Sequence, residues 1–440
     1  MINLLEKWYV SHQFSKAMKR GNSQQATKLL KKIIKSGNQL SWQEDLYRNY
    51  LNLNLSLKQQ ENSLQKLNKQ LKNFNKQSND LNLPSDFFGD ESNFIPDAKV
   101  IQHIIQDFKI IEHDSALLQC TGIDKTVFNQ FEAHLADFVQ EEFNQYSKRP
   151  NFNTLLYQAV EDINRLKHGE DPSYYFELSP HVYLIRYFLE NVYCAYLAWF
   201  LIYQSGLLPT HLNILDIAAG PSTIAYGLDL FLESAQKLTD LPSMQASYYS
   251  LEKQDKFQYR GLQLWRRYIE QKHNPSNVYF RFDTQDLFND PSSFKKIPDQ
   301  FFDFIFISHC LFYDLKSRQH FNQLFNNIFL NNLKPNGFVL LIIQDKKLFK
   351  AYNLKPTKNY NQEKEIIDDL LKSMGLKLFW YKYLTSTDRR TGMKGREFGK
   401  FASDYLPSQT RISQLTKKYL GIKYDLNYTL DDYVILAQKL

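Results

Sequence analysis

After Pro209, short apolar runs of strand length alternate with longer stretches that have the periodicity of helices. This alternation is typical of βαβ units, which build a parallel sheet covered by helices. It predicts an α/β fold for residues 209–440. The expected strands are Asn213–Ile217, Ser247–Leu251, Val278–Phe282, Phe302–Ser308 and Phe338–Ile343, with Leu376–Leu384 and Tyr433–Gln438 as a late pair.

The first 208 residues show three- and four-residue apolar spacing instead, as in Ala26–Ile34, where lysines lie between the apolar positions. This spacing predicts an all-helical N-terminal region. Small polar residues and helix breakers gather in Gln77–Asp97. We therefore expect a basic helical region at 1–80 and a linker at 81–97. Residues 98–208 are predicted to form a helical domain packed on the α/β domain.

The net charge of +7 is unevenly distributed along the chain. Residues 1–80 contain 14 Lys and Arg against 5 Asp and Glu, whereas residues 81–210 contain 8 against 18. The two blocks could attract each other within one molecule. Alternatively, the basic block faces an anionic partner, of which RNA or a ribonucleoprotein is the example that we consider.

Composition indicates a protein of the cytoplasm. The three cysteines are far apart, so they build no disulfide framework and no zinc site, and we expect no bound metal. The most apolar stretch, Val192–Tyr203, spans about twelve residues, whereas about twenty are needed to cross a bilayer. It therefore predicts a buried helix. Met1–Val10 carries charged residues where a signal peptide would be apolar.

The most informative segment is Leu212–Thr223, with the sequence LNILDIAAGPST. An apolar strand leads into Asp216, then into small residues, then into a helix. A carboxylate at the end of a buried parallel strand is costly without partners, and small residues let a ligand approach the backbone closely. A dinucleotide fingerprint would need glycine in place of Ala218 and Thr223, so it does not fit.

With this segment the chain resembles the class I S-adenosylmethionine-dependent methyltransferases, whose first motif is an apolar strand, an acid and a glycine-rich turn. Ala218 and Ser222 stand where that family has glycine. Further motifs follow in the family's order, including Asp303 at the start of its fourth strand. The resemblance implies a Rossmann-like, seven-stranded methyltransferase sheet and S-adenosylmethionine as cofactor. The cofactor-binding positions it implies are Asp216, Ala218, Gly220, Ser222, Glu252, Asp283, Asp286 and Ser308.

Within that set, the resemblance gives each acid a separate place on the nucleoside. Glu252 ends the second strand, where the family has an acid that holds the ribose hydroxyls. Asp283 and Asp286 follow the third strand, where an acidic turn lies beside the adenine amino group. Asp216 and Glu252 are therefore expected to hold the cofactor between two neighbouring strand ends.

His309 follows the fourth strand and is a candidate base for a hydroxyl or an amine. A structural histidine at a strand end is the alternative. Cys310 is expected to pack, since the Pro-Cys pair of cytosine-C5 methyltransferases is missing. The turn typical of exocyclic amino methylases is missing as well.

An insertion at 386–432 begins with arginines, lysines and glycines beside aromatic residues. Arg389, Arg390, Lys394 and Arg396 are candidate substrate-binding residues in a mobile basic lid over an anionic substrate. The alternative is a solvated loop. Residues Ile214–Gly261 are also faintly similar to the mitochondrial-type small-ribosomal-subunit methyltransferase-like family, although that family's cysteine cluster is absent.

These observations predict an S-adenosylmethionine-dependent methyltransferase with RNA or a ribonucleoprotein as its favoured target. A small-molecule or protein acceptor is the first alternative. The second alternative is a catalytically silent protein that has this fold and acts as a binding or assembly factor. Its first 200 residues would then carry the binding or assembly function. The replacement of two motif glycines by Ala218 and Ser222 favours that alternative. The presence of both expected acids, Asp216 and Glu252, opposes it.

Overall fold

The computed structural model describes residues 10–14, 16–17, 23–35, 93–168, 170–272, 277–284, 286, 297–311, 314–356, 359–393 and 395–440. The chain divides into two units, Met1–Gly89 and Asp90–Leu440. In the first unit, helix α2 (Ser23–Lys35) buries Ala26, Leu30 and Ile33, as its apolar spacing predicts. The predicted linker lies outside the described residues as far as residue 92.

A nine-stranded sheet forms the centre of the second unit, in the order β1-β2-β8-β9-β7-β6-β3-β4-β5. Its strands are β1 (Ile111–Glu112), β2 (Leu117–Gln119), β3 (His211–Ile217), β4 (Gln245–Glu252), β5 (Asn277–Thr284), β6 (Phe302–Ser308), β7 (Leu333–Gln344), β8 (Leu376–Thr385) and β9 (Asp431–Lys439). All seven predicted strands are present.

The connections within this sheet define the fold class. Strands β5, β4, β3, β6 and β7 are parallel, and their order in the chain is 3-2-1-4-5, as in a doubly wound Rossmann sheet. Strand β9 enters between β7 and β8 and is antiparallel to both. The predicted Rossmann-like sheet is confirmed, with nine strands in place of the expected seven.

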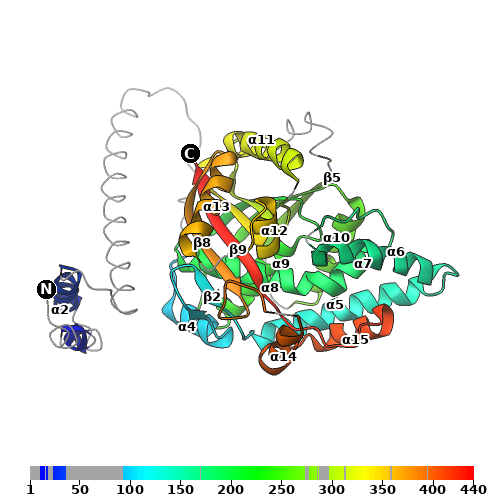
Figure 1. The fold of residues 1–440 in the computed structure, drawn as a ribbon, viewed down its shortest axis with the longest axis horizontal. Coiled ribbons are helices and arrows are strands. Elements are labelled where there is room, and N and C mark those ends of the chain that lie inside the picture. Colours follow the sequence, from blue (N-terminus) through cyan, green and yellow to red (C-terminus); the bar gives the residue numbers. More distant parts are fainter. Residues whose placement is uncertain are drawn as a thin grey trace. The chain divides into compact units, whose positions relative to one another are not determined.

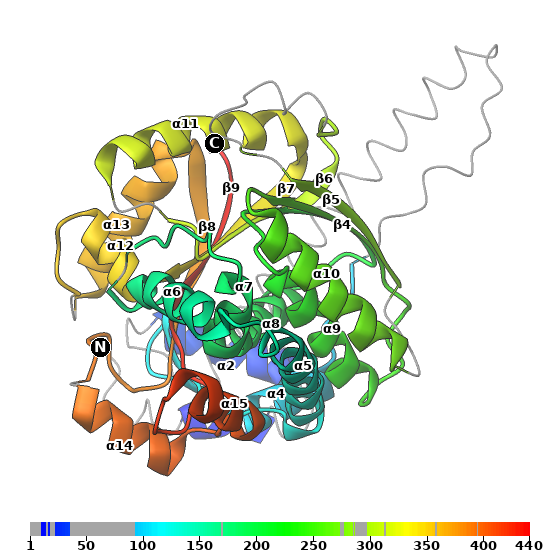
Figure 2. The same ribbon diagram turned by 90° about the vertical axis from the view of Figure 1, so that its right-hand side faces the viewer.

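Helices cover both faces of the sheet (Figures 1 and 2). One face carries α8 (Leu189–Gln204), α9 (Thr223–Gln236) and α10 (Asp255–Glu270), and the other carries α11 (Leu315–Asn332), α12 (Asp345–Ala351) and α13 (Tyr360–Ser373). Because successive side chains of a strand point to opposite faces, Ile214 belongs to the first core and Leu215 to the second. Both faces of the central strands are buried, which explains their near-continuous apolar sequences.

Helix α8 contains the most apolar stretch of the sequence and is buried almost all round. Its Trp199 indole donates a hydrogen bond to the carbonyl of Ile224, in α9, at 3.0 Å. The two helices touch at Gly227, where an added Cβ would lie 2.6 Å from the Ala195 Cβ. Among the described helices, none is both long enough and apolar enough to cross a membrane.

The segment before the sheet contributes α4 (Ala98–Asp107), α5 (Lys125–Tyr146), α6 (Phe152–Asn164) and α7 (Ser179–Tyr183), and a π-helical turn, Leu184–Phe188, joins α7 to α8. Its core is continuous with the first face of the sheet. The prediction that this segment is entirely helical is wrong in one place. The short strands β1 and β2 extend the sheet, because β2 pairs in parallel with the edge strand β8.

The insertion at 386–432 folds into α14 (Gly395–Tyr405) and α15 (Thr410–Leu420) rather than into a loop. Ile412 and Leu415 of α15 are buried in the core. The Glu132 carboxylate, on α5, accepts hydrogen bonds from the backbone N–H groups of Arg411 and Ile412 at 2.7 and 3.0 Å. It therefore satisfies free donors at the start of α15 and ties that helix to α5.

Candidate active site at the carboxyl edge of the sheet

Three residues of the turn between β3 and α9 have left-handed backbone conformations. Ala218, Gly220 and Ser222 have φ values of 55°, 53° and 66°. A left-handed conformation costs a residue with a side chain roughly 1–2 kcal/mol. Ala218 and Ser222 therefore adopt a conformation that glycine accepts more readily, at the positions where the predicted motif has glycine. Strain of this kind persists where the surrounding structure enforces it, which is common at ligand sites.

Glu252, the last residue of β4, turns its carboxylate toward this turn. One oxygen accepts a hydrogen bond from the Gly220 N–H at 2.7 Å, and the other accepts from the Gln254 N–H at 2.8 Å. The residue is only 9% exposed, and burial raises the pKa of its carboxyl group. The two strand ends are thus connected directly, at the point where open α/β sheets bind ligands.

Asp216 lies deeper, on β3, and is 1% exposed. The Tyr248 hydroxyl donates a hydrogen bond to one carboxylate oxygen, and the other oxygen has no partner among the described residues. Burial raises the pKa of this carboxyl group to about 7. The neighbouring carboxyl group of Glu252 contributes to this rise in the pKa, and the hydrogen bond from Tyr248 opposes it.

A cavity of about 470 Å³ opens at this edge of the sheet. Its floor consists of residues at the strand ends, and its roof comes from the segment before the sheet. The floor includes Ala218, Gly220, Glu252, Ser308, His309 and Gln344, and the roof includes Tyr174, Tyr175, Tyr183, Tyr187 and Asn191. Asp216 is not part of the lining. Of the two acids expected to hold the cofactor, only Glu252 reaches the cavity.

The roof is held in place by specific polar contacts. Asn191 donates a hydrogen bond to the Tyr183 hydroxyl at 2.7 Å, and Asp171 forms an ion pair with Lys347 of α12 at 2.7 Å. Lys347 is only 3% exposed. Tyr183 directly precedes a π-helical turn and Tyr187 lies within it, and such turns are often found at functional sites. The segment before β3 therefore contributes a large part of the cavity wall.

The far end of the cavity carries Ser308, His309 and Cys310. The Ser308 hydroxyl lies 2.8 Å from His309 Nδ1, and His309 Nε2 lies 3.1 Å from an oxygen of Asp432. Burial raises the pKa of the Cys310 thiol to about 12, so it stays protonated near neutral pH. Asp432 was not among the predicted site residues. It is the second acid of an Asp-Asp pair that opens β9.

Four of the predicted cofactor-binding residues, Asp216 among them, lie away from the cavity lining. Ser222 is buried in the turn. Asp283 accepts a hydrogen bond from the Tyr249 hydroxyl at 3.2 Å, and Asp286 forms an ion pair with Lys253 at 2.8 Å. The structure therefore brings Ala218, Gly220, Glu252 and Ser308 of the predicted set together around the cavity, with His309 beside them.

The prediction for Arg390 is wrong. Its guanidinium is buried, forms a bidentate ion pair with Asp114 at 2.6 and 3.0 Å, and contacts Glu363 at 3.1 Å. Opposite charges hold the side chain inside the protein, where it is only 6% exposed and out of reach of a substrate on the surface. Lys394 lies outside the described residues.

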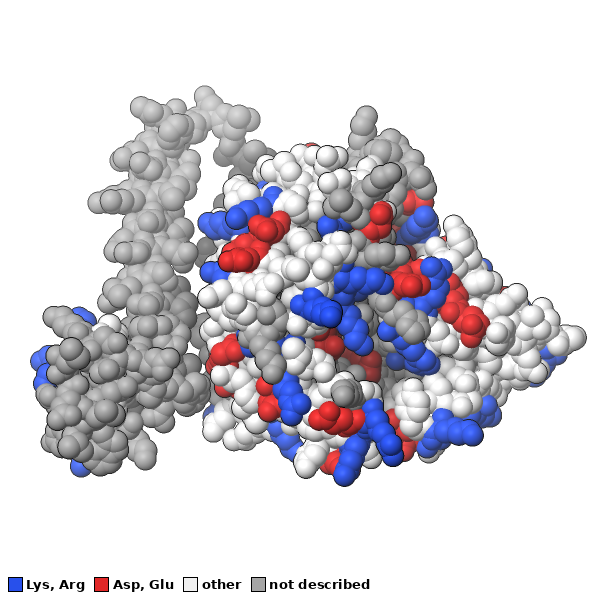
Figure 3. Space-filling view, in the orientation of Figure 1, with Lys and Arg blue, Asp and Glu red and all other residues white. Residues whose placement is uncertain are grey.

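Arg389 and Arg396 remain accessible on the insertion. Arg389 forms ion pairs with Asp388 and Glu397 at 3.4 and 3.8 Å. Arg396 lines a groove along α14 together with Lys400 and the exposed Tyr405. On the face shown in Figure 3, blue and red side chains are interspersed.

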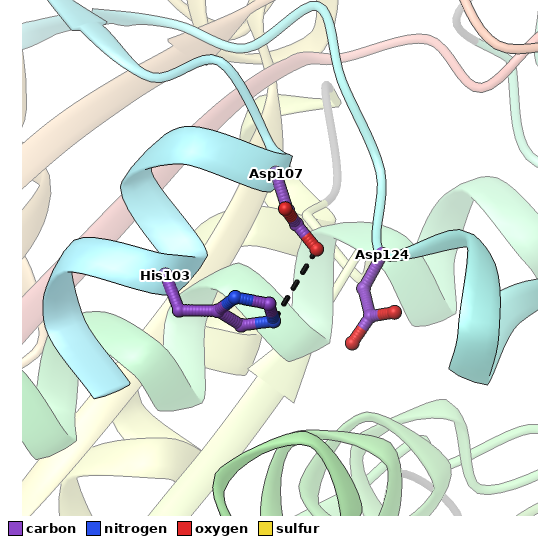
Figure 4. Close-up of side chains that lie close together, drawn as sticks. All are labelled: His103, Asp107 and Asp124. Carbon is purple, nitrogen blue, oxygen red and sulfur yellow. Dashed lines mark ion pairs between the residues drawn. The ribbon is translucent and has the colours of Figure 1, made fainter. Parts of the chain in front are cut away.

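A second group of titratable side chains lies on the same unit, at the end of α4. His103 Nε2 and Asp107 form an ion pair at 3.3 Å, and Asp124 comes close to both (Figure 4). Asp124 begins α5 and accepts hydrogen bonds from the Thr126 N–H, the Thr126 hydroxyl and the Ser234 hydroxyl. Asp124 is therefore buried because it caps the start of α5.

No protein-family model matches this chain, and no curated protein matches it. Solved structures of methyltransferases match it. One from Aquifex aeolicus shares 15% identity over 39% of this chain and 74% of its own length, with a TM-score of 0.25. One from Bacillus halodurans shares 14% over 54% of this chain and 96% of its own, with a TM-score of 0.28.

A third matching structure is the Methanococcus jannaschii fibrillarin pre-rRNA processing protein, with 11% identity over 52% of this chain and 67% of its own, and a TM-score of 0.28. The sheet topology gives the chain a doubly wound, Rossmann-like fold. The fainter likeness to the mitochondrial-type family stays a prediction.

Proposed function

We propose that this protein is an S-adenosylmethionine-dependent methyltransferase whose cofactor binds in the cavity at the ends of β3 and β4. The observation that carries the proposal is the Glu252 carboxylate, which lines the cavity while it accepts the Gly220 N–H at 2.7 Å. A carboxylate at that place can accept the protons of two vicinal hydroxyls. The sheet topology and the left-handed turn support it.

The residues around the cavity fit the cofactor. An added Cβ at Gly220 would meet no protein atom within 4 Å, so a ligand can approach the backbone there. Glu252 would hold the ribose, and Ala218 and Gly220 would lie beside the amino-acid portion. Asp216 would act from behind the turn, because it does not line the cavity. When bound, the cofactor supplies an electrophilic methyl group on a sulfonium.

For the acceptor we propose RNA or a ribonucleoprotein on the basis of charge. The support is the excess of Lys and Arg in residues 1–80 and the accessible Arg389, Arg396 and Lys400 on the insertion. Arg390 gives this proposal no support, because it is buried in ion pairs. The residues that line the cavity do not select RNA over a small molecule or a protein side chain. A cytoplasmic location goes with this proposal, since all three cysteines are free thiols.

A binding or assembly factor without catalysis is the second candidate. One specific observation favours it: the Tyr248 hydroxyl, which belongs to the protein itself, already occupies one oxygen of Asp216. In that case the cavity would bind no sulfonium nucleoside, and the exposed surfaces of the protein would bind its partners.

Isothermal titration calorimetry with S-adenosylmethionine separates the two candidates. We expect saturable binding, weakened about ten-fold or more in Glu252→Gln, because the amide accepts a hydroxyl proton less strongly than a carboxylate. Asp255→Asn is the matched control, since Asp255 is exposed and lies three residues further on. No binding by the wild type, or equal binding by Glu252→Gln, would remove the enzyme proposal.

A further inference from the structure

Ser308, His309 and Asp432 form a continuous hydrogen-bonded chain from the cavity wall into the protein. The Ser308 hydroxyl contacts His309 Nδ1 at 2.8 Å, and His309 Nε2 contacts Asp432 Oδ1 at 3.1 Å. Ser308 and His309 line the cavity, whereas Asp432 is 8% exposed and lies behind them. The antiparallel direction of β9 makes this possible, since its first residues lie at the edge where the parallel strands end.

The hydrogen-bonding capacities of the three groups set the direction of the chain. An ionised carboxylate only accepts, so Asp432 receives the Nε2–H of His309. In the neutral imidazole, Nδ1 then carries the lone pair and accepts the Ser308 hydroxyl proton. The Ser308 oxygen keeps its own lone pairs free to accept one more proton from a group in the cavity.

Acidic side chains lie on the far side of His309 from the cavity. Asp432 contacts it directly, and the buried Glu190 carboxyl group, on α8, lies close enough to Asp432 to interact with it electrostatically. Glu190 also accepts a hydrogen bond from the Thr429 hydroxyl at 2.8 Å. Asp431, the residue before Asp432, accepts a hydrogen bond from the Tyr383 hydroxyl instead. An imidazolium would therefore be paired with Asp432.

The backbone at His309 is strained. Its φ of 57° is left-handed, and its N–H donates to the Ile342 carbonyl, on β7, at 2.8 Å. This conformation carries the ring past the end of β6 toward β9. Non-glycine residues keep such conformations where the surroundings enforce them.

We infer that Ser308, His309 and Asp432 form a proton relay for the methyl acceptor, and that the acceptor atom therefore carries a hydrogen, as a hydroxyl or an N–H does. The inference rests on the proposed methyltransferase function. Thioethers and tertiary amines, which have no proton to lose, are not the substrate class.

The step balances in atoms and charge. The acceptor atom bonds to the methyl carbon as the carbon–sulfur bond breaks, and sulfur keeps the electron pair. The acceptor's proton passes to the Ser308 oxygen while the Ser308 proton passes to His309 Nδ1. Ser308 ends unchanged, and the positive charge ends on the imidazolium, beside Asp432. Asp432 is a positioning residue, because it acts through His309.

NMR of the full chain labelled with ¹⁵N-histidine tests the relay without any turnover. We expect a slowly exchanging, strongly downfield Nε2–H proton of His309, assigned by its loss in His309→Gln. It should disappear in Asp432→Ala and remain in the matched control Asp431→Ala. Asp432→Asn, which keeps the shape of the side chain, is the fallback if Asp432→Ala does not fold, and should shift the signal upfield.

Two ligand comparisons then test whether the relay faces the reacting methyl group. S-adenosylmethionine should move the His309 ring signals more than S-adenosylhomocysteine does, because only the former brings the methyl group and its positive charge. In the complex with S-adenosylhomocysteine, phenol should bind about ten-fold more tightly than anisole, which differs by lacking the hydroxyl proton.

The outcomes separate this inference from the proposed function. If S-adenosylmethionine does not bind at all, the proposed function fails, whatever His309 does. If it binds but the Nε2–H signal is absent or survives in both Asp432 variants unchanged, the relay is wrong and the methyltransferase stands. Equal effects of phenol and anisole, or none from either, would overturn the assignment of a protonated acceptor.

Discussion

The carboxylate of Glu252, at the end of β4, accepts the backbone N–H of Gly220, in the turn after β3, at 2.7 Å. This single contact joins two neighbouring parallel strands at the edge of the sheet where the cavity opens. It orients Glu252 and holds Gly220 in its left-handed conformation. The floor of the cavity is therefore preorganised before any ligand enters.

Substitutions at Ala218 should separate backbone strain from cavity volume. Ala218→Gly accepts the φ of 55° without a side-chain penalty, so we expect unchanged cofactor binding and a free energy of unfolding that is equal or higher by up to about 1 kcal/mol. Ala218→Val places a β-branched side chain in a left-handed conformation at the cavity wall, and we expect cofactor binding to be lost. Calorimetry and urea unfolding check both variants, and intact binding by Ala218→Val would contradict the placement of the cofactor.

The contact between α8 and α9 gives a second prediction. In Gly227→Ala the new Cβ would lie 2.8 Å from backbone atoms of Ala195 and Tyr196, so the helices must separate. We expect a loss of about 1–3 kcal/mol in the free energy of unfolding. Gly399→Ala, on the exposed helix α14, meets no atom within 4 Å and should gain about 0.5–1 kcal/mol from helix propensity. Equal effects in urea unfolding would show that the two helices are not packed as described.

Arg390 should prove to be a structural residue. Arg390→Met leaves Glu363, which is fully buried, without its cationic partner, and we expect a loss of about 3–5 kcal/mol. Arg389 directly precedes Arg390, but its side chain is half exposed. Arg389→Ala should therefore change the free energy of unfolding by no more than about 0.5 kcal/mol. Urea denaturation of both variants is the measurement. A stable Arg390→Met that loses RNA affinity would restore the predicted substrate role.

Much of the fold could be predicted because hydrophobic pattern and strand length agree in the buried sheet. Phe302–Ser308 was predicted as it is observed, and Tyr433–Gln438 lies within β9. The strands β1 and β2 were missed because two or three residues give no measurable periodicity. Their pairing depends on the edge of β8, which lies more than 250 residues away in the sequence.

The candidate site divides in the same way. Glu252 could be found because it ends a strand that follows the first motif. Asp432 could not, because an antiparallel strand reverses which of its ends reaches the cavity. Arg390 was assigned to the substrate because its partners Asp114 and Glu363 come from distant segments. The one feature of the sequence that could have pointed to Asp432 was the Asp-Asp pair at the start of β9.

Stability should depend on pH through buried acids. Burial raises the pKa of Asp216 and Glu190 to about 7 and that of Asp345 to about 8, so the folded state keeps protons that the unfolded state releases above about pH 4. Each such group therefore makes the free energy of unfolding fall by up to about 1.4 kcal/mol per pH unit, from about pH 4 until the folded group ionises. Asp345→Asn removes one of them.

Urea unfolding of the wild type and Asp345→Asn between pH 5 and 9 is the check. We expect the variant's advantage over the wild type to grow steadily from pH 5 to about pH 8, where folded Asp345 is protonated and unfolded Asp345 is ionised, and to level off above pH 8. Parallel curves across this range would mean that Asp345 is not buried as a neutral acid.

The most direct test of the cofactor site is a crystal structure of the protein soaked with S-adenosylhomocysteine. We predict electron density in the cavity between Gly220 and Glu252, with both ribose hydroxyls within hydrogen-bond distance of the Glu252 carboxylate. Density for the nucleoside at another place, or an empty cavity at a saturating concentration of the ligand, would contradict the account.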